Sequence, residues 1–230
     1  MNDVHRISMG MNMVQEKNER RSNLSRERPA TALRHQGLRE ELVAAAAMLI
    51  ESEGLAQLRA RDLATATGCS VGAIYNIFAD LDELVLEVNA GTLRAISRTM
   101  QAIGGASPAA QLAAMADAYL DYAAAHRRRW DALFNHRMPL EALAPGWFQE
   151  VQDAAFSHIE NPLAMLRPDL DATARRLLGR SIFAAVQGMV ALGLDNRLAP
   201  MDLELLRAQI GLVVGAIIAG LTAASPGGAK

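Results

Sequence analysis

The fold is decided by one stretch, residues 58–78, which reads LRARDLATATGCSVGAIYNIF. Ala64 is small enough to sit where two helices cross, and Gly68 can adopt the positive φ that a sharp turn requires. Ser70 can cap a second helix through its hydroxyl. The apolar side of the pair is supplied by Leu63, Cys69, Ile74 and Ile77. The stretch therefore predicts a helix-turn-helix, with one short helix before Gly68 and another after Ser70.

The residues on either side continue the helical pattern. Before the stretch, apolar residues recur at helical spacing from Leu42 to Leu49, and Gly54 is placed to end that helix. After it, Asp80 and Glu83 fit a capping box with Asp in place of Ser or Thr. About nine helices are expected, near residues 38–53, 60–67, 71–78, 80–103, 108–125, 127–137, 146–165, 170–194 and 200–223.

The composition favours an all-α, soluble chain. Of its 230 residues 51% are apolar and only 4% aromatic, and β-branched residues rarely alternate with polar ones. The single cysteine, Cys69, excludes an internal disulfide and a multi-cysteine metal cage, so a reducing cytoplasm is the simplest compartment. We expect neither a metal nor another cofactor, because His126, His136 and His158 lack the i, i+4 partners typical of helical metal sites.

The charge is unevenly distributed along the chain. Because the formal net charge is −2, any nucleic-acid role must rest on local charge. In residues 1–36, Lys and Arg outnumber Asp and Glu, and no apolar secretory segment is present. Such a stretch is most often a solvated tail; the functional alternative is an arm that neutralises DNA phosphate.

The residues around the turn resemble the tetracycline-repressor-like (TetR) family of bacterial regulators. The match runs from about Leu38 to Leu86. It includes, in order, Gly54, Leu63-Ala64, Gly68, Ser70, Gly72, Tyr75, Phe78 and Leu84. The resemblance implies a dimeric regulator, with a helix-turn-helix that docks in the major groove of DNA and a helical C-terminal domain that senses a ligand and dimerises.

The resemblance also implies which residues contact DNA. Tyr75 should contact a phosphate, and Arg59 stands where the family often has a phosphate-binding threonine. The base edges should be met by Val71, Gly72, Ala73 and Asn76, of which Asn76 can pair with adenine. The expected DNA-binding set is completed by Arg34, Arg39 and Ser70. Because Val71 and Leu81 stand where lysine is common in the family, we expect DNA affinity to depend on the basic arm.

Small residues near the C-terminus predict a dimer. Gly211, Gly215 and Ala219 recur at intervals of four and would let two helices approach closely. With Gly188 on the preceding helix, they favour a four-helix bundle between two copies, whose two-fold symmetry would match a palindromic operator. The alternative is pairing of membrane helices, but the apolar run over residues 210–224 is shorter than the ~20 residues that span a bilayer.

Large, soft side chains in the C-terminal part are candidates for an apolar ligand cavity, although core packing also explains them. They are Met115, Tyr119, Trp130, Phe134, Met138, Trp147, Phe148, Phe156, Met165 and Phe183. Trp130, Phe134 and Gln187-Gly188 resemble a C-terminal subtype of the family that usually carries histidine before the glycine. Gln187 replaces that histidine here.

One motif suggests an enzyme. Residues 68–72 fit the Gly-x-Ser-x-Gly elbow of α/β-hydrolases, but an alanine-rich helical segment precedes them where that motif needs a strand. A helical enzyme or carrier is a further alternative without a visible acid–base cluster. We therefore expect no enzyme, but a cytoplasmic repressor released from double-stranded DNA by a small lipophilic ligand. The expected divisions are a basic arm (1–37), a DNA-binding domain (38–84), a ligand-binding and dimerisation domain (85–224) and a flexible tail (225–230).

Overall fold

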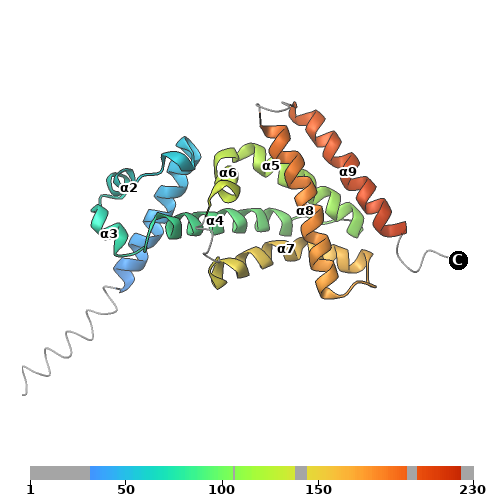
Figure 1. Cartoon of the computed structure of the whole chain (residues 1–230), viewed down its shortest axis with the longest axis horizontal. Helices are drawn as coiled ribbons and strands as arrows, with labels where there is room; N and C mark the ends of the chain where they lie inside the picture. Colours follow the sequence, from blue (N-terminus) through green and yellow to red (C-terminus); the bar gives the residue numbers. More distant parts are fainter. Residues whose placement is uncertain (1–31, 106, 138–143, 196–200, 224–230) are drawn as a thin grey trace, which may run out of the picture.

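The computed structural model describes residues 32–105, 107–137, 144–195 and 201–223, and within these ranges the chain is helical without a strand. The predicted all-α fold is thus confirmed. The helical elements are residues 32–53, the 3₁₀ turn η1 (Leu55–Gln57), α2 (Ala60–Thr67), α3 (Val71–Tyr75), α4 (Leu81–Gln101), α5 (Pro108–Ala125), α6 (Arg127–Asn135), α7 (Gly146–Leu166), α8 (Ala172–Leu194) and α9 (Leu203–Ala223) (Figure 1).

Two helix boundaries differ from those predicted. Residues 32–37 are already helical, so the first helix begins earlier than the predicted start near residue 38. Ala, Leu and Arg at positions 32–34 are strong helix formers, and they outweigh the modest cost of Gly37 inside the helix. Helix α3 ends at Tyr75, short of Phe78. Three predicted features lie outside the described residues: positions 1–31 of the arm, Met138 and the tail 225–230.

The turn between α2 and α3 has the predicted geometry. Gly68 has a φ of 67°, in the left-handed region that favours glycine. The Ser70 hydroxyl accepts a hydrogen bond from the Ala73 N–H at 3.1 Å and so caps α3. Leu63 and Ala64 are buried where the two helices meet. Together these contacts orient α3 so that one side faces solvent.

The start of α4 is capped from both directions. Asp80 Oδ1 accepts a hydrogen bond from the Glu83 N–H at 2.8 Å, as the capping box predicted. Glu83 Oε2 in turn accepts from the Ala79 N–H at 2.8 Å, one residue before the position reached in the usual box. This N–H, followed by the Arg39 guanidinium, holds the pKa of Glu83 below its ordinary value of 4.5.

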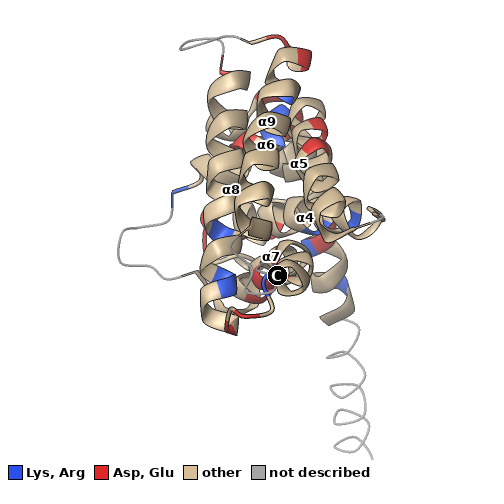
Figure 2. Cartoon of the chain, turned by 90° about the vertical axis from the view of Figure 1, so that its right-hand side faces the viewer, with Lys and Arg blue, Asp and Glu red and all other residues tan. Residues whose placement is uncertain are grey.

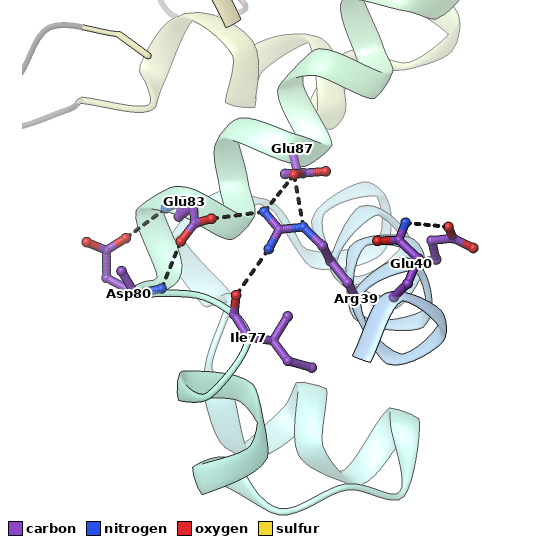
Figure 3. Close-up of polar contacts among 8 residues, drawn as sticks. Arg39, Glu40, Ile77, Asp80, Glu83 and Glu87 are labelled. Carbon is purple, nitrogen blue, oxygen red and sulfur yellow. Dashed lines mark hydrogen bonds and ion pairs between the residues drawn. The ribbon is translucent and has the colours of Figure 1, made fainter. Parts of the chain in front are cut away.

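One arginine joins the first helix to α4 and to the turn after α3. Arg39 Nη2 lies 2.9 Å from Glu83 Oε1 and 2.7 Å from Glu87 Oε1. Its Nη1 donates to the Ile77 carbonyl at 3.1 Å (Figure 3). Its guanidinium lies 4.4 Å from the centre of the Phe78 ring. The contacts link the first helix to the turn after α3 and to α4, about 40 positions further along the chain, and fix α3 relative to α4.

Helix α4 takes part in two hydrophobic cores. Its first turns, with Leu84 and Val88, pack in the core of the helix-turn-helix domain against the fully buried Phe78. Its later turns, with Ile96 and Met100, pack in a second core formed with α5, α8 and α9. The helix-turn-helix lies at one end of the molecule and the α8–α9 pair at the other, with α4 extending between them (Figure 1).

Helices α8 and α9 approach closely at one glycine. A Cβ atom added to Gly193 would lie 2.5 Å from Leu206 Cδ1, well inside van der Waals contact. Leu206 is itself fully buried in the second core. A side chain at position 193 would therefore force the buried Leu206 side chain or the two helices to shift.

We predict that Arg39→Met lowers the free energy of unfolding by ~1–2 kcal/mol at pH 7, because it removes the charged hydrogen bonds but keeps the alkyl packing. The pKa of Glu83 is lowered in the folded state, so the ionised Glu83 carboxylate stabilises the fold fully above pH 4.5. This stabilisation is lost as the pH falls through the lowered pKa. The difference between wild type and variant should therefore shrink in acid.

Urea unfolding at several pH values measures this difference. Arg61→Met on the exposed side of α2 serves as a control and should leave the stability nearly unchanged. Equal stability of the Arg39 and Arg61 variants at pH 7 would contradict the assignment.

Candidate functional site

The outward side of α3 carries several of the residues predicted to read DNA. Tyr75 has an exposed fraction of 49%, and Gly72 and Asn76 are also exposed. Val71 and Ala73 are half-buried, whereas Ile74 holds the helix to the core. Tyr75 and Asn76 thus present a hydroxyl and an amide on the same short surface, where a groove or a phosphate could be contacted.

Two arginines predicted to bind DNA have partners inside the domain. Arg39 bonds to Glu83, Glu87 and the Ile77 carbonyl. Arg59 donates from Nη1 to the Ala56 carbonyl at 2.8 Å. We therefore infer that Arg39 positions α3 and α4, and its contact with DNA stays a prediction. The sequence could not reveal its role because its acidic partners lie more than 40 positions away.

The surface around α3 carries little available positive charge. Arg34 and Arg61 are exposed, but Asp62 and Asp80 are exposed too. The Ser70 hydroxyl, also predicted to meet DNA, is exposed while it caps α3. Because each missing cation removes a phosphate contact, this surface by itself should bind DNA weakly.

The C-terminal helices enclose an apolar cavity of about 290 Å³. Most of the candidate residues described there line it, namely Met115, Tyr119, Phe134, Phe148, Phe156 and Phe183. Trp130 and Trp147 are absent from the lining, and Met165 is exposed. The prediction missed the contributions of α4 and α9, such as Ile96, Met100 and Ile218, whose apolar spacing is the same as that of ordinary core residues.

Trp130 supports the cavity wall from behind. Its Nε1 donates to the Tyr119 hydroxyl at 2.8 Å, and that hydroxyl donates to Gln187 Oε1. The Tyr119 and Phe183 rings meet edge to face with their centres 5.5 Å apart. Burial raises the pKa of Tyr119 well above its usual value. Gln187, which stands where the resemblance predicted a histidine, thus serves as a hydrogen-bond acceptor.

Helix α6 lies between the cavity and the DNA-binding domain. Leu133 and Phe134 line the cavity, while the neighbouring Ala132 is buried in the core of the helix-turn-helix domain. Asn89 on α4 donates to the Ala132 carbonyl at 3.4 Å. Side chains of one short helix therefore touch both the cavity and the domain that carries α3.

Both ends of α6 are also bonded to that domain. At its C-terminal end, His136 Nε2 lies 2.9 Å from Asp82 Oδ1 at the start of α4. At its N-terminal end, Arg128 donates to the Glu51 carbonyl of the first helix at 3.4 Å. A displacement of α6 would therefore disturb its contacts with both helices that support α3, namely the first helix and α4.

The outer side of α8 and α9 is apolar and exposed. Leu192 and Leu212 have exposed fractions of 52% and 66%. The predicted dimerisation residues, Gly188, Gly211, Gly215 and Ala219, are all exposed, and a Cβ at any of the three glycines would meet no atom within 4 Å. Most of both helices carries no charged residue (Figure 2). By length and composition either helix could cross a membrane, but both bury residues in the second core.

Among the described residues, no group of three or more His, Cys, Asp or Glu side chains is arranged to hold a metal ion. The three surfaces predicted from the sequence are the exposed side of α3, the apolar cavity and the outer side of α8 and α9.

Comparison with solved structures shows the same fold at low sequence identity. A TetR-family transcriptional regulator from Streptomyces coelicolor is 18% identical, with a TM-score of 0.59, over 82% of this chain and 81% of that one. RolR in complex with resorcinol is 14% identical, with a TM-score of 0.61, over 84% and 96%. BioQ with its double-stranded DNA operator is 18% identical, with a TM-score of 0.59, over 80% and 98%.

Comparison with family models matches both parts of the chain, whereas curated protein sequences give no match. Residues 42–88 match the bacterial regulatory proteins of the tetR family. Residues 112–212 match a tetracyclin repressor-like C-terminal domain. The first match covers the helix-turn-helix and the second covers much of the cavity and of the α8–α9 pair. The chain therefore belongs to the TetR family of DNA-binding transcriptional regulators.

Proposed function

We propose that this protein is a homodimeric, cytoplasmic repressor that leaves a palindromic operator when a small lipophilic molecule enters the apolar cavity. One observation carries the proposal: α6 touches the cavity through Leu133 and Phe134 and the DNA-binding core through Ala132. A ligand that prefers one position of α6 would shift the population between DNA-binding and released states. The RolR–resorcinol and BioQ–operator complexes support ligand and DNA as partners.

The outer side of α8 and α9 supports the homodimer. Large exposed apolar patches on soluble proteins are usually interaction surfaces, and glycines without neighbours allow a second backbone to approach. Two-fold pairing through these helices would give two copies of α3. In the proposed dimer they are about 34 Å apart, one turn of DNA, as a palindromic operator requires.

Sequence-specific DNA binding is the direct test. Fragments selected from the protein's own upstream region should shift in a gel, and the shift should weaken as salt rises. Asn76→Ala should weaken binding to the selected site by about 1–3 kcal/mol but change non-specific binding little. Gln101→Ala, at the far end of α4, is the control. The absence of any salt-sensitive, sequence-specific shift would overturn the proposal.

The basic arm should supply affinity that the α3 surface lacks. Removing the residues before Arg34 should weaken binding to all DNA sequences and reduce the slope of log affinity against log salt by about 0.9 for each phosphate that the arm no longer neutralises. The truncation also removes residues 32 and 33 of the first helix. A full-length variant with Arg20, Arg21, Arg26 and Arg28 changed to Gln tests the loss of positive charge alone. Equal affinity of truncated and full-length chains would rule out this role for the arm.

A charge on the outer side of α9 should dissociate the dimer. Gly215→Glu places an ionised carboxylate where we propose that two helices meet, and burying it is unfavourable. Sedimentation velocity should show a dimer for wild type and a monomer for the variant. Ala113→Glu, exposed on α5, should remain dimeric. A variant at position 215 that stays dimeric would place the interface elsewhere.

A further inference from the structure

Among the residues that the structure describes, no charged side chain lines the cavity. The lining comes from α4 through α9 and is almost entirely aliphatic and aromatic. An ionised ligand group placed in such surroundings would lose its hydration without gaining a partner, which is strongly unfavourable. The volume of about 290 Å³ lies at the lower end of the range for small-molecule sites.

Two polar side chains of the described chain reach the cavity, and one of them is available to a ligand. The hydroxyl of Tyr119 donates to Gln187 and accepts from Trp130, so its donor is used within the wall. Gln152 on α7 is half-buried and has no hydrogen-bond partner among the described residues. Its amide offers both a donor and an acceptor.

Gln152 lies toward the end of the cavity that adjoins the DNA-binding domain. It follows Phe148 by one turn on the same side of α7, and Phe148 packs against Leu86 and Ala90 in the early turns of α4. Further along, Ile159 of α7 and Met100 of α4 line the cavity. A ligand bonded to Gln152 would therefore extend its apolar part away from the DNA-binding domain.

One cation beside the cavity, Arg180, is already paired with a carboxylate. Arg180 on α8 lies 5.2 Å from the centre of the Phe156 ring, and its Nη2 is 3.0 Å from Asp153 Oδ1. Both members of this pair are largely solvent-exposed and neither lines the cavity. An anionic group would therefore meet a salt bridge and not a free guanidinium.

We propose that Gln152 determines ligand specificity by selecting an uncharged, mainly apolar molecule with one hydroxyl or carbonyl group. The inference rests on the proposed sensor role of this cavity. It names the chemistry of the molecule that the cavity accepts: the polar group pairs with the Gln152 amide, and the chain or ring fills the space toward Met100 and Ile159.

Two probes that differ in charge test the proposal. Isothermal titration of the full-length protein at pH 7.5 compares 1-octanol with octanoate, which share a chain length. We expect 1-octanol to bind at least about tenfold more tightly. Gln152→Leu should weaken 1-octanol binding about tenfold, because the hydroxyl loses its partner. Gln149→Leu, on the same helix but outside the cavity, should change neither affinity.

The outcomes separate the inference from the proposed function. If octanoate binds as tightly as 1-octanol and Arg180→Met weakens octanoate binding, the cavity selects an anionic ligand and the inference of an uncharged ligand is wrong. Unchanged 1-octanol affinity in Gln152→Leu, with an unchanged circular dichroism spectrum, would remove Gln152 from the site. Failure of both probes to bind wild type would overturn the sensor cavity itself, and the specificity inference with it.

Discussion

The structure depends on the burial of one helix in two hydrophobic cores. The first turns of α4 complete the core that supports α3, and its later turns form a wall of the apolar cavity. A helix is stiff along its axis because its backbone hydrogen bonds close within it. In the proposed function, a change of packing around Met100 and Ile96 would move Leu84 and Val88, and through them α3.

Helix α6 makes this connection specific. It packs one residue, Ala132, into the DNA-binding core and the next two into the cavity wall. The bond from Asn89 and the His136–Asp82 pair hold it against α4. Asn89 Oδ1 is buried without a hydrogen-bond partner among the described residues, so the contact between α4 and α6 leaves one polar atom unsatisfied. In the proposed function, a second position of α6 would have to replace these bonds with others.

The turn could be predicted from the sequence because its requirements are local. The positive φ of Gly68 and the cap by Ser70 involve neighbours within three residues. The role of Arg39 was not predictable, since it depends on Glu83 and Glu87 across a turn and two helices. The aromatic residues that line the cavity were all among the sequence candidates, whereas the aliphatic lining from α4 and α9 was not predicted. Trp130 stands behind the wall, and Gln152 was overlooked because one glutamine on a helix carries no pattern.

The central claim is that occupation of the cavity moves the two DNA-binding domains relative to each other. A chain with the changes Cys69→Ser and Ala66→Cys can be spin-labelled on the exposed side of α2. Pulsed electron–electron double resonance then measures the distance between the two copies of this helix in the dimer. The account predicts one distance distribution without ligand and a displaced one with saturating 1-octanol. An unchanged distribution, while titration shows 1-octanol bound, would contradict it.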